Sequence, residues 1–338
     1  MSHADRLSQI EQLLLAHPEG LLRADIARRL GVHRSTVTRD INELSYTRPI
    51  FEEVDRRVRL ERGSYETAIH LTMFELEALH LAARLFARVM KFPFPHASAA
   101  LRKLAAAQGR VSPRLSGWMR DTADEIESFP VSSAEVTARY RTIIEQLGEA
   151  ITDSRPVIAD YYSRTNDAIR AYWVIPLTLE PHHEGRAVHV VAWNLPMEDD
   201  GFRTLKVERI HSLELQPPDP DLVSQIPVQD IRSRFSSAWS IWASDNEPVR
   251  VVLRFSAVVA DRVVETLWHA SQQVIHREDG GVEWSGQIAE PREMYPWIRG
   301  WGPDVEVMEP QWLREQHQRD FTSGTELYKN SATGETDV

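Results

Sequence analysis

Cysteine is absent from the 338-residue chain, which excludes disulfide bonds, thiolate metal sites and a cysteine nucleophile. No run of about 18 apolar residues occurs, so we expect no segment that crosses a membrane. The opening residues, MSHADRLSQIEQ, lack the basic and then apolar pattern of a secretory signal peptide. Together these absences predict a soluble, cytoplasmic protein.

Positive charge is in short supply, because 39 lysines and arginines stand against 50 acids and give a net charge of −11. The arginines are nevertheless concentrated between residues 23 and 39, where five of them accompany one acid, Asp25. Net charge describes the whole surface and not one face of it, so the acidic balance does not exclude DNA binding. With 42% apolar residues the chain can form packed cores, and its length predicts two or three domains.

The first 62 residues predict a winged helix-turn-helix domain. Apolar residues recur at helical spacing in three stretches, and Gly31 permits a sharp turn before the third, residues 34–44. Val37, Ile41 and Leu44 then face the core, and a polar face points outward, as in helices that read a major groove. The alternative is a three-helix bundle with a solvated face. The candidate DNA contacts are Arg23, Arg34, Ser35, Thr38, Arg39 and Asn42.

The stretch PIFEEVDRRVRLERG, residues 49–63, predicts two short strands that form the wing. Arg56 and Arg57 of this wing are candidate contacts to backbone phosphate. Three acids of the same stretch compete for these arginines, so an alternative in which the wing arginines are paired internally stays open.

Residues 63–153 predict a helical linker that also pairs two chains. Its apolar residues recur at helical spacing, and Thr72 with Glu75 forms a capping-box pattern. From Pro156 the pattern changes to a period of two, which predicts five short strands in residues 156–216. Five short strands in about 60 residues are typical of a small, strongly bent antiparallel barrel.

His182 and His183, followed by Glu184, form a weak candidate for a metal site. Adjacent residues on a turn rarely converge on one ion, and no third ligand stands at usable spacing. We therefore predict no metal ion and no cofactor.

The prolines of QPPDPDLVSQIP, residues 216–227, predict a linker. Beyond it the pattern indicates strands at 249–255, 272–276, 282–288 and 304–308, with helices at 257–268, 291–301 and 310–318. This βαββαβ order predicts a ferredoxin-like domain, and the polar residues 321–338 predict a disordered tail. Three residues beside the barrel are candidates to face a ligand, with ordinary packing as the alternative: His269, Ser271 and Gln272.

Residues 161–210 resemble the WYL domain of bacterial transcription regulators. Tyr161 and Ser163 match the family's Tyr-x-Ser, and RTLKVERI at 203–210 matches its Arg-x-Phe-Arg-x-x-Arg-Ile. The name-giving Trp-Tyr-Leu is replaced by Val188-His189-Val190, although some members have a histidine at the position of His189. Further matches are the Pro-x-x-Leu of Pro176 and Leu179, and the WCX extension over residues 248–320 with its Trp-Ile-x-Gly-x-Gly at 297–302.

The resemblance implies a winged helix-turn-helix, an Sm-like barrel that senses an effector, and a C-terminal extension that helps to build a dimer. In several members the effector is nucleic acid or a nucleotide. Arginine forks, hydroxyls and a ring together can hold a phosphate. The candidate ligand contacts are Tyr161, Ser163, His189, Arg203, Lys206 and Arg209.

Alternation along their strand predicts Arg203, Leu205, Val207 and Arg209 on one face, with Lys206 on the other. The alternatives are a core histidine with satisfied hydrogen bonds at His189 and an ion pair between Arg209 and a nearby acid.

We therefore predict a multidomain α+β chain that works as a homodimeric, ligand-responsive transcription regulator on a double-stranded DNA operator. The alternatives are an oligonucleotide-sensing module that controls a protein partner and an enzyme that processes nucleic acid. For the enzyme, no carboxylate pair or nucleophile–base arrangement has the required spacing. The predicted segments are a winged helix-turn-helix at 1–62, a helical linker at 63–153, a WYL barrel at 154–218, a linker at 219–247, a WCX domain at 248–320 and a disordered tail at 321–338.

Overall fold

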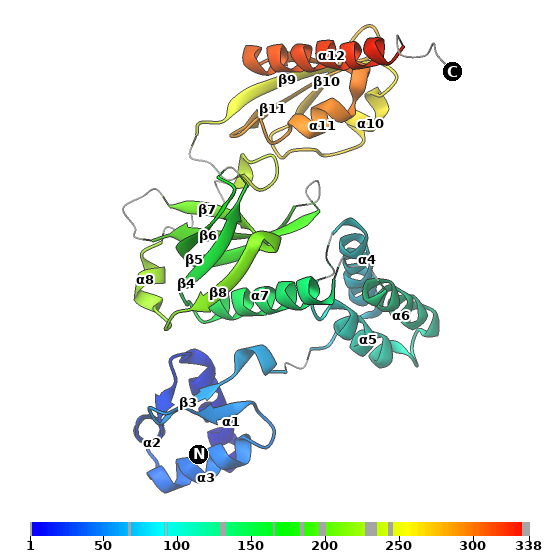
Figure 1. Ribbon diagram of the computed structural model, residues 1–338. Coiled ribbons are helices and arrows are strands. Elements are labelled where there is room, and N and C mark those ends of the chain that lie inside the picture. Colours follow the sequence, from blue (N-terminus) through cyan, green and yellow to red (C-terminus); the bar gives the residue numbers. More distant parts are fainter. Residues whose placement is uncertain are drawn as a thin grey trace, which may run out of the picture. The chain divides into compact units, whose positions relative to one another are not determined.

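The computed structural model describes residues 2–66, 69–90, 92, 94–128, 133–164, 166–182, 186–195, 201–226, 235–242 and 246–332. The chain divides into two compact units, Met1–Gln225 and Ile226–Val338. Among the described residues, three apolar cores lie in the first unit and one lies in the second. The fold is a multidomain α+β architecture, as the sequence predicts (Figure 1).

A winged helix-turn-helix forms the N-terminal part of the first unit (Figure 1). Gly31 has a φ of +66°, which gives the turn between α2 and α3 without steric cost. Ile10, Ile26, Val37 and Val58 are fully buried in the core between helices and sheet. The helices are α1 (His3–Ala16), α2 (Arg23–Leu30) and α3 (Arg34–Leu44), and the sheet has the order β1 (Leu21–Leu22), β3 (Arg57–Leu60), β2 (Ile50–Glu52).

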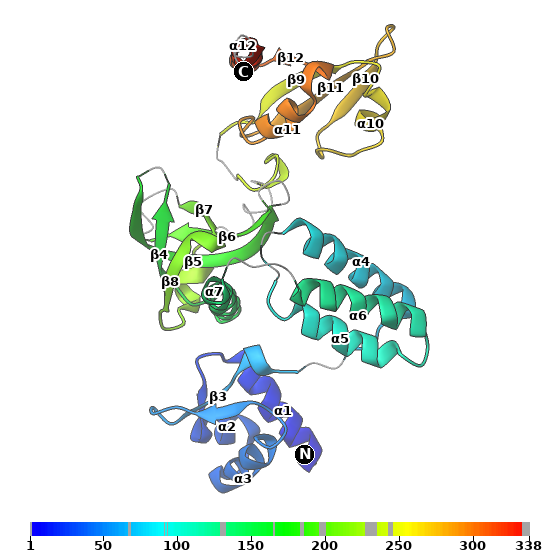
Figure 2. The same ribbon diagram turned by 45° about the vertical axis from the view of Figure 1, so that its right-hand side comes forward.

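Three further helices pack around a second core, as Figure 2 shows. They are α4 (Met73–Val89), α5 (Ala97–Gln108) and α6 (Pro113–Glu127), preceded by the one-turn helix η1 (Arg62–Ser64). Thr72 and Glu75 form the predicted capping box at the start of α4. The core side chains are Leu76, Leu101, Ala105, Leu115, Met119, Ala123 and Ile126.

The last helix of the predicted linker, α7 (Ala134–Thr152), does not belong to this helical core. Ile143, Ile144 and Leu147 are instead buried with the strands of the following sheet, and both ribbon views show α7 along that sheet. The predicted boundary at residue 154 therefore separates α7 from the sheet on which it packs. Helical spacing reveals that α7 has an apolar face but not which core that face enters.

The sheet of the first unit is antiparallel and has the strand order β7-β6-β5-β4-β8. Register shifts at Pro176/Thr178 and at Asp160/Tyr161 bend two of its strands. The one-turn helix η2 (Val207–Arg209) joins the two edge strands, so the sheet curls back on itself. The strands are β4 (Val157–Ser163), β5 (Ala168–His182), β6 (Ala187–Asn194), β7 (Phe202–Lys206) and β8 (Ile210–Leu215), and the short helix α8 (Pro220–Ser224) follows.

The second unit has the predicted β–α–β–β–α–β order. Its sheet is antiparallel with the order β10-β11-β9-β12, and Phe255, Trp284 and Val307 are buried on one face. The elements are β9 (Val249–Phe255), α10 (Ala260–Val264), β10 (Gln273–His276), β11 (Val282–Ile288), α11 (Tyr295–Gly300), η3 (Gly302–Asp304), β12 (Val305–Glu309) and α12 (Gln311–Ala332).

The first helix of this unit is shorter than the predicted 257–268. Gln272 explains the difference, because its Oε1 accepts from the backbone N–H groups of Trp268 (2.8 Å) and His269 (3.3 Å). Its Nε2 also donates to the carbonyl of Thr266 at 3.2 Å. The side-chain amide of Gln272 thus forms hydrogen bonds with backbone groups that would pair with one another in a longer helix.

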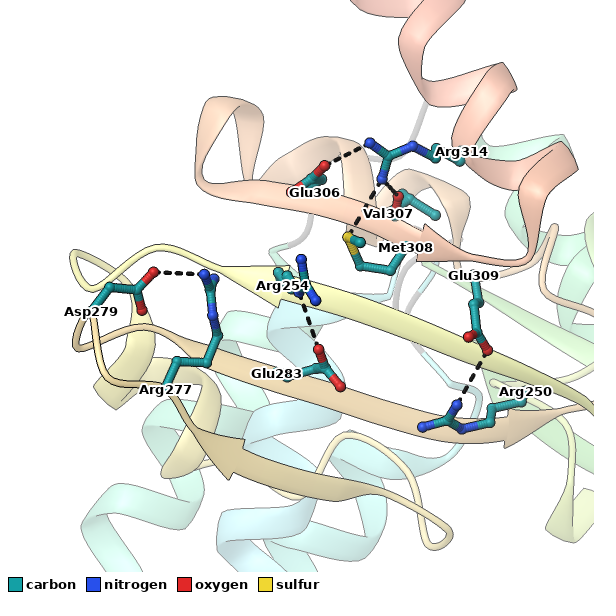
Figure 3. A network of polar contacts seen from close by, with 10 residues as sticks. All are labelled: Arg250, Arg254, Arg277, Asp279, Glu283, Glu306, Val307, Met308, Glu309 and Arg314. Atoms are coloured by element: carbon teal, nitrogen blue, oxygen red, sulfur yellow. Dashed lines mark hydrogen bonds and ion pairs between the residues drawn. The ribbon is translucent and has the colours of Figure 1, made fainter.

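Ion pairs cover the polar face of the same sheet (Figure 3). Arg254 and Glu283 are cross-strand neighbours with a 3.1 Å contact, and Arg250 reaches Glu309 at 3.3 Å. Arg314 of α12 binds Glu306 at 2.7 Å and the carbonyl of Val307 at 2.6 Å. Because its charges are paired, we assign no anion-binding role to this face.

The predicted disordered tail is wrong over residues 321–332, because α12 continues to Ala332. Polar composition alone predicted disorder, yet Phe321 packs edge-to-face on His317 at 4.8 Å between ring centroids. Residues 333–338 of the tail lie outside the described residues.

Candidate nucleic-acid interface and ligand site

The outer face of α3 is polar and largely exposed, as predicted from its spacing. Val37, Ile41 and Leu44 are buried on the opposite side of the helix. No hydrogen bond or ion pair to another described residue engages the side chains of Arg34, Arg39 and Asn42. The remaining candidates hold the helix locally: Ser35 contacts the capping residue His33, and Thr38 donates to the carbonyl of Arg34.

A buried ion pair, which the sequence did not reveal, fixes α3 against α1. Asp40 is fully buried, and its carboxylate accepts from Arg6 Nε (2.5 Å) and Nη2 (3.1 Å). The guanidinium of Arg6 lowers the pKa of Asp40. The available signal was the position of Asp40, three residues after Val37 and next to Ile41, on the edge of the apolar face.

The other candidate arginines of this domain differ in whether they form ion pairs or hydrogen bonds with neighbouring residues. Arg23 is ion-paired with Glu52 of the wing, and Arg57 contacts Asp55 (3.4 Å) and donates to the carbonyl of Gly20 (2.9 Å). Arg56 is exposed at the tip of the wing with a φ of +64°, and no ion pair to a described residue holds it. Of the two wing arginines, Arg57 is therefore paired inside the domain, and Arg56 forms no ion pair with a described residue.

On the curled sheet, the predicted ligand residues separate into two groups. Tyr161 and Arg203 lie on the face that carries the apolar core, at opposite sides of Tyr172. The Arg203 guanidinium carbon is 4.4 Å from the centre of the Tyr172 ring, and its Nε donates to Asn194 Oδ1 at 3.3 Å. The rings of Tyr161 and Tyr172 meet edge-to-face at 5.9 Å. Ser163, also on β4, accepts from Asn166 at 3.2 Å.

The second group lies on the other face, where His189 of β6 is the direct cross-strand neighbour of Lys206. The ring centroids of His189 and His182 are 5.5 Å apart. Burial and, to a smaller extent, the charges of His182, Lys206 and Arg209 together lower the pKa of His189 to about 3. This imidazole is neutral, and its buried Nδ1 has no hydrogen-bond partner among the described residues. This observation does not favour the alternative of a core histidine with satisfied hydrogen bonds.

The prediction that Arg203 and Arg209 share one strand face is also wrong. Strand β7 ends at Lys206, and Arg209 lies in η2, where the alternation of period two stops. Arg209 is close enough to act on the pKa of His189. Arg209 and Lys206 are both among the cations that lower this pKa, and Arg203 is not.

The three candidates of the second unit have structural partners. His269 is buried and its Nδ1 lies 2.8 Å from the Ser271 hydroxyl, while Gln272 also accepts from the indole of Trp284 at 3.1 Å. Of the weak metal candidate only His182 is described, since His183 and Glu184 lie outside the described residues. Within the described part, no cluster of three histidine or acidic side chains could hold a metal ion.

Three family models match the chain in the order that the geometry suggests. They are an HTH domain at residues 6–56, a WYL domain at 142–215 and a WCX domain at 247–321. The chain belongs to the WYL-domain regulators. This domain content is that of a DNA-binding transcription regulator. The WYL match begins inside α7, in agreement with the burial of that helix against the sheet.

Solved structures similar to this WYL-domain regulator include the proteasome accessory factor PafBC of Arthrobacter aurescens, with 18% identity and a TM-score of 0.31. That match covers 92% of this chain but 47% of the other, so the chain spans about half the length of PafBC. A CRISPR Cas-related protein shares 12% identity over 78% of this chain and 76% of its own, with a TM-score of 0.40. No curated protein matches the chain.

Among the described residues, no helix combines the length and the apolar character needed to cross a membrane.

Proposed function

We propose that this chain is a homodimeric transcription regulator whose operator binding responds to a nucleic-acid or nucleotide-like anion. The observation that carries the proposal is the polar face of α3. Arg34, Arg39 and Asn42 project from it without internal partners among the described residues, whereas nearby Arg23 and Arg57 are paired with acids. Free cations and an amide on one exposed helix face suit phosphates and base edges in a major groove.

The effector site is best supported around Lys206 and Arg209. Neither cation forms an ion pair with a described residue, and the neutral ring of His189 offers a buried, unpartnered Nδ1 beside them. Charge-assisted hydrogen bonds from such cations bind phosphate oxygens. Arg203 is instead engaged with Tyr172, an arginine–aromatic platform of the kind on which a base can stack.

A contact inside the first unit offers a route from this sheet to the DNA reader. Arg62 in η1 donates to the carbonyl of Leu15 at the end of α1 and to that of Thr152 at the end of α7, the latter at 3.1 Å. Its Nη1 also lies 3.3 Å from Asp153. Since α7 packs on the sheet, a ligand that favours one position of α7 would bias the winged helix through Arg62.

Replacing Lys206 and Arg209 together with alanine is expected to weaken effector binding by about 10²–10⁴-fold, because each charged contact contributes about 1.5–3 kcal/mol. Fluorescence anisotropy of a labelled single-stranded oligonucleotide measures this loss. Operator binding without oligonucleotide should be unchanged. Arg170→Ala, at an exposed arginine of β5, is the matched control and should bind like the wild type. Equal affinity of the double variant and the control would exclude this site.

Arg62→Met is expected to reduce the coupling between the two sites and to leave each binding event intact. Coupling is measured as the ratio of operator affinities with and without saturating oligonucleotide, and coupling free energies usually correspond to factors of about 5–150. We expect this ratio to approach one. Arg155→Met is the control, because Arg155 bonds Glu149 and the carbonyl of Gln216 within the WYL region. An unchanged ratio in Arg62→Met would exclude Arg62 as the route.

A further inference from the structure

Helix α4 carries an apolar stripe whose large side chains are mostly exposed among the described residues. Phe74, Leu81 and Leu85 are 74%, 59% and 68% exposed. Together with Ala78, which is also exposed, they recur at spacings of four, three and four residues and therefore share one side of the helix. The opposite side carries Leu76 and His80, both buried in the helical core. Three large apolar side chains aligned in water indicate a binding surface.

The charges beside this stripe indicate which occupant fits. Glu77 and Arg84 lie seven residues apart, two helical turns, and therefore on the same flank of the stripe. Neither residue forms an ion pair with a described residue. In an antiparallel pair related by a two-fold axis, the same flanks of both helices adjoin with their directions reversed. Glu77 of one chain then lies beside Arg84 of the partner subunit.

A parallel pair would bring opposite flanks together and place Glu77 beside Glu75 of the partner subunit, which is a repulsive contact. The apolar side chains also favour the antiparallel arrangement. Its two-fold axis lies between Ala78 and Leu81, so Phe74 meets Leu85 of the partner subunit at each end. The small Ala78 and the exposed Ala82 near the axis allow the two helices to approach closely.

We propose that the stripe Phe74–Ala78–Leu81–Leu85 is a self-pairing surface that joins two copies of this chain through antiparallel α4 helices. This inference rests on the proposed dimeric regulator and names its contact surface. The pairing concerns α4 alone and needs no DNA or effector. Its tests therefore use the full chain without DNA and without effector. A failure of the proposed pairing can then be distinguished from a failure of the proposed function.

The first test is the dissociation constant of the dimer, measured by analytical ultracentrifugation between about 0.1 and about 100 µM. Leu81→Glu is expected to raise this dissociation constant about 100-fold, because each substitution in a symmetric interface acts twice. Leu79→Glu is the matched control, since Leu79 is 49% exposed on another side of α4, and it should match the wild type. Circular dichroism checks whether both variants fold. A wild type that stays monomeric, or an unchanged constant in Leu81→Glu, overturns the proposal.

Charge reversal distinguishes the direction of pairing. Glu77→Arg and Arg84→Glu should each weaken the dimer about 3- to 10-fold, as two symmetric surface ion pairs allow. The double variant should recover most of the affinity, because the swapped charges meet again across the antiparallel axis. Additive weakening in the double variant contradicts the antiparallel arrangement.

The absence of cysteine in the chain permits a second, direct test by oxidative cross-linking. Ala78→Cys lies next to the proposed two-fold axis and should form a disulfide-linked dimer. Phe74→Cys should not link to itself but should link in a mixture with Leu85→Cys, since these positions face each other. Self-linking of Phe74→Cys indicates parallel helices, and failure of Ala78→Cys to link indicates another interface. Either result overturns the proposal.

Discussion

Replacing Arg39 and Asn42 together with alanine is expected to weaken specific operator binding by about 10²–10⁴-fold. Each side chain that reads a base edge contributes about 1–3 kcal/mol, and both point outward from α3 without internal partners among the described residues. If Arg39 also neutralises a phosphate, the plot of log K against log salt should be less steep for the variant, with the magnitude of its negative slope smaller by about 0.9. Anisotropy titrations of operator DNA at several salt concentrations measure both effects.

The matched control for this result is Arg28→Ala, which removes the same charge from the neighbouring helix. Arg28 is 78% exposed and ion-paired with Asp25 at 2.9 Å, so its loss should change operator affinity by less than about 3-fold, as for a surface pair. Equal losses in the two variants would mean that α3 contributes charge alone and does not read the operator.

Asp40→Ala is expected to lower the free energy of local opening of α3 by about 3–5 kcal/mol, because it leaves Arg6 without its buried partner. The Asp40 side chain is fully buried, and that of Arg6 is 12% exposed. Native-state hydrogen exchange of α3 backbone amides in the full chain measures the change, which should appear as a large loss of protection.

The same pair predicts a pH dependence. Arg6 lowers the folded-state pKa of Asp40, so the carboxylate stabilises the fold above its unfolded pKa of about 3.9. That contribution is lost as the pH falls through the lower folded value. The difference in α3 protection between wild type and Asp40→Ala should therefore be constant near neutral pH and disappear in acid.

A double variant, Arg6→Met with Asp40→Leu, tests whether the pair provides stability or only avoids an unpaired charge. Apolar replacement of both members of a buried pair is often neutral or stabilising, so α3 protection should return toward the wild-type level. Unchanged protection in Asp40→Ala would show that the pair does not hold α3 in place.

Helix α3 was predictable from the sequence because local signals agree there. Gly31 provides the turn, His33 caps the helix, and Val37, Ile41 and Leu44 define its buried side, so α3 begins and ends where predicted. The βαββαβ order of the second unit was predictable for the same reason. Periodicity and turn residues report local conformation, and these elements depend on little else.

The candidate ligand site was only partly predictable, because it depends on contacts between distant strands. Alternation placed Arg209 with Arg203, but η2 interrupts the strand and moves Arg209 toward His189. The engagement of Arg203 with Tyr172 joins residues 31 positions apart in sequence, which no local pattern encodes. The same holds for Asp40, whose partner Arg6 lies on another helix.

The central claim is that an anionic effector changes operator binding by this chain. The most direct measurement is binding of the purified protein to DNA upstream of its own gene, between about 50 and about 200 mM salt, with and without short single-stranded oligonucleotides. We expect saturable, salt-sensitive binding whose affinity changes by about 5- to 150-fold with the oligonucleotide. Binding no tighter than to unrelated genomic DNA, at every salt concentration and with or without oligonucleotide, would contradict it.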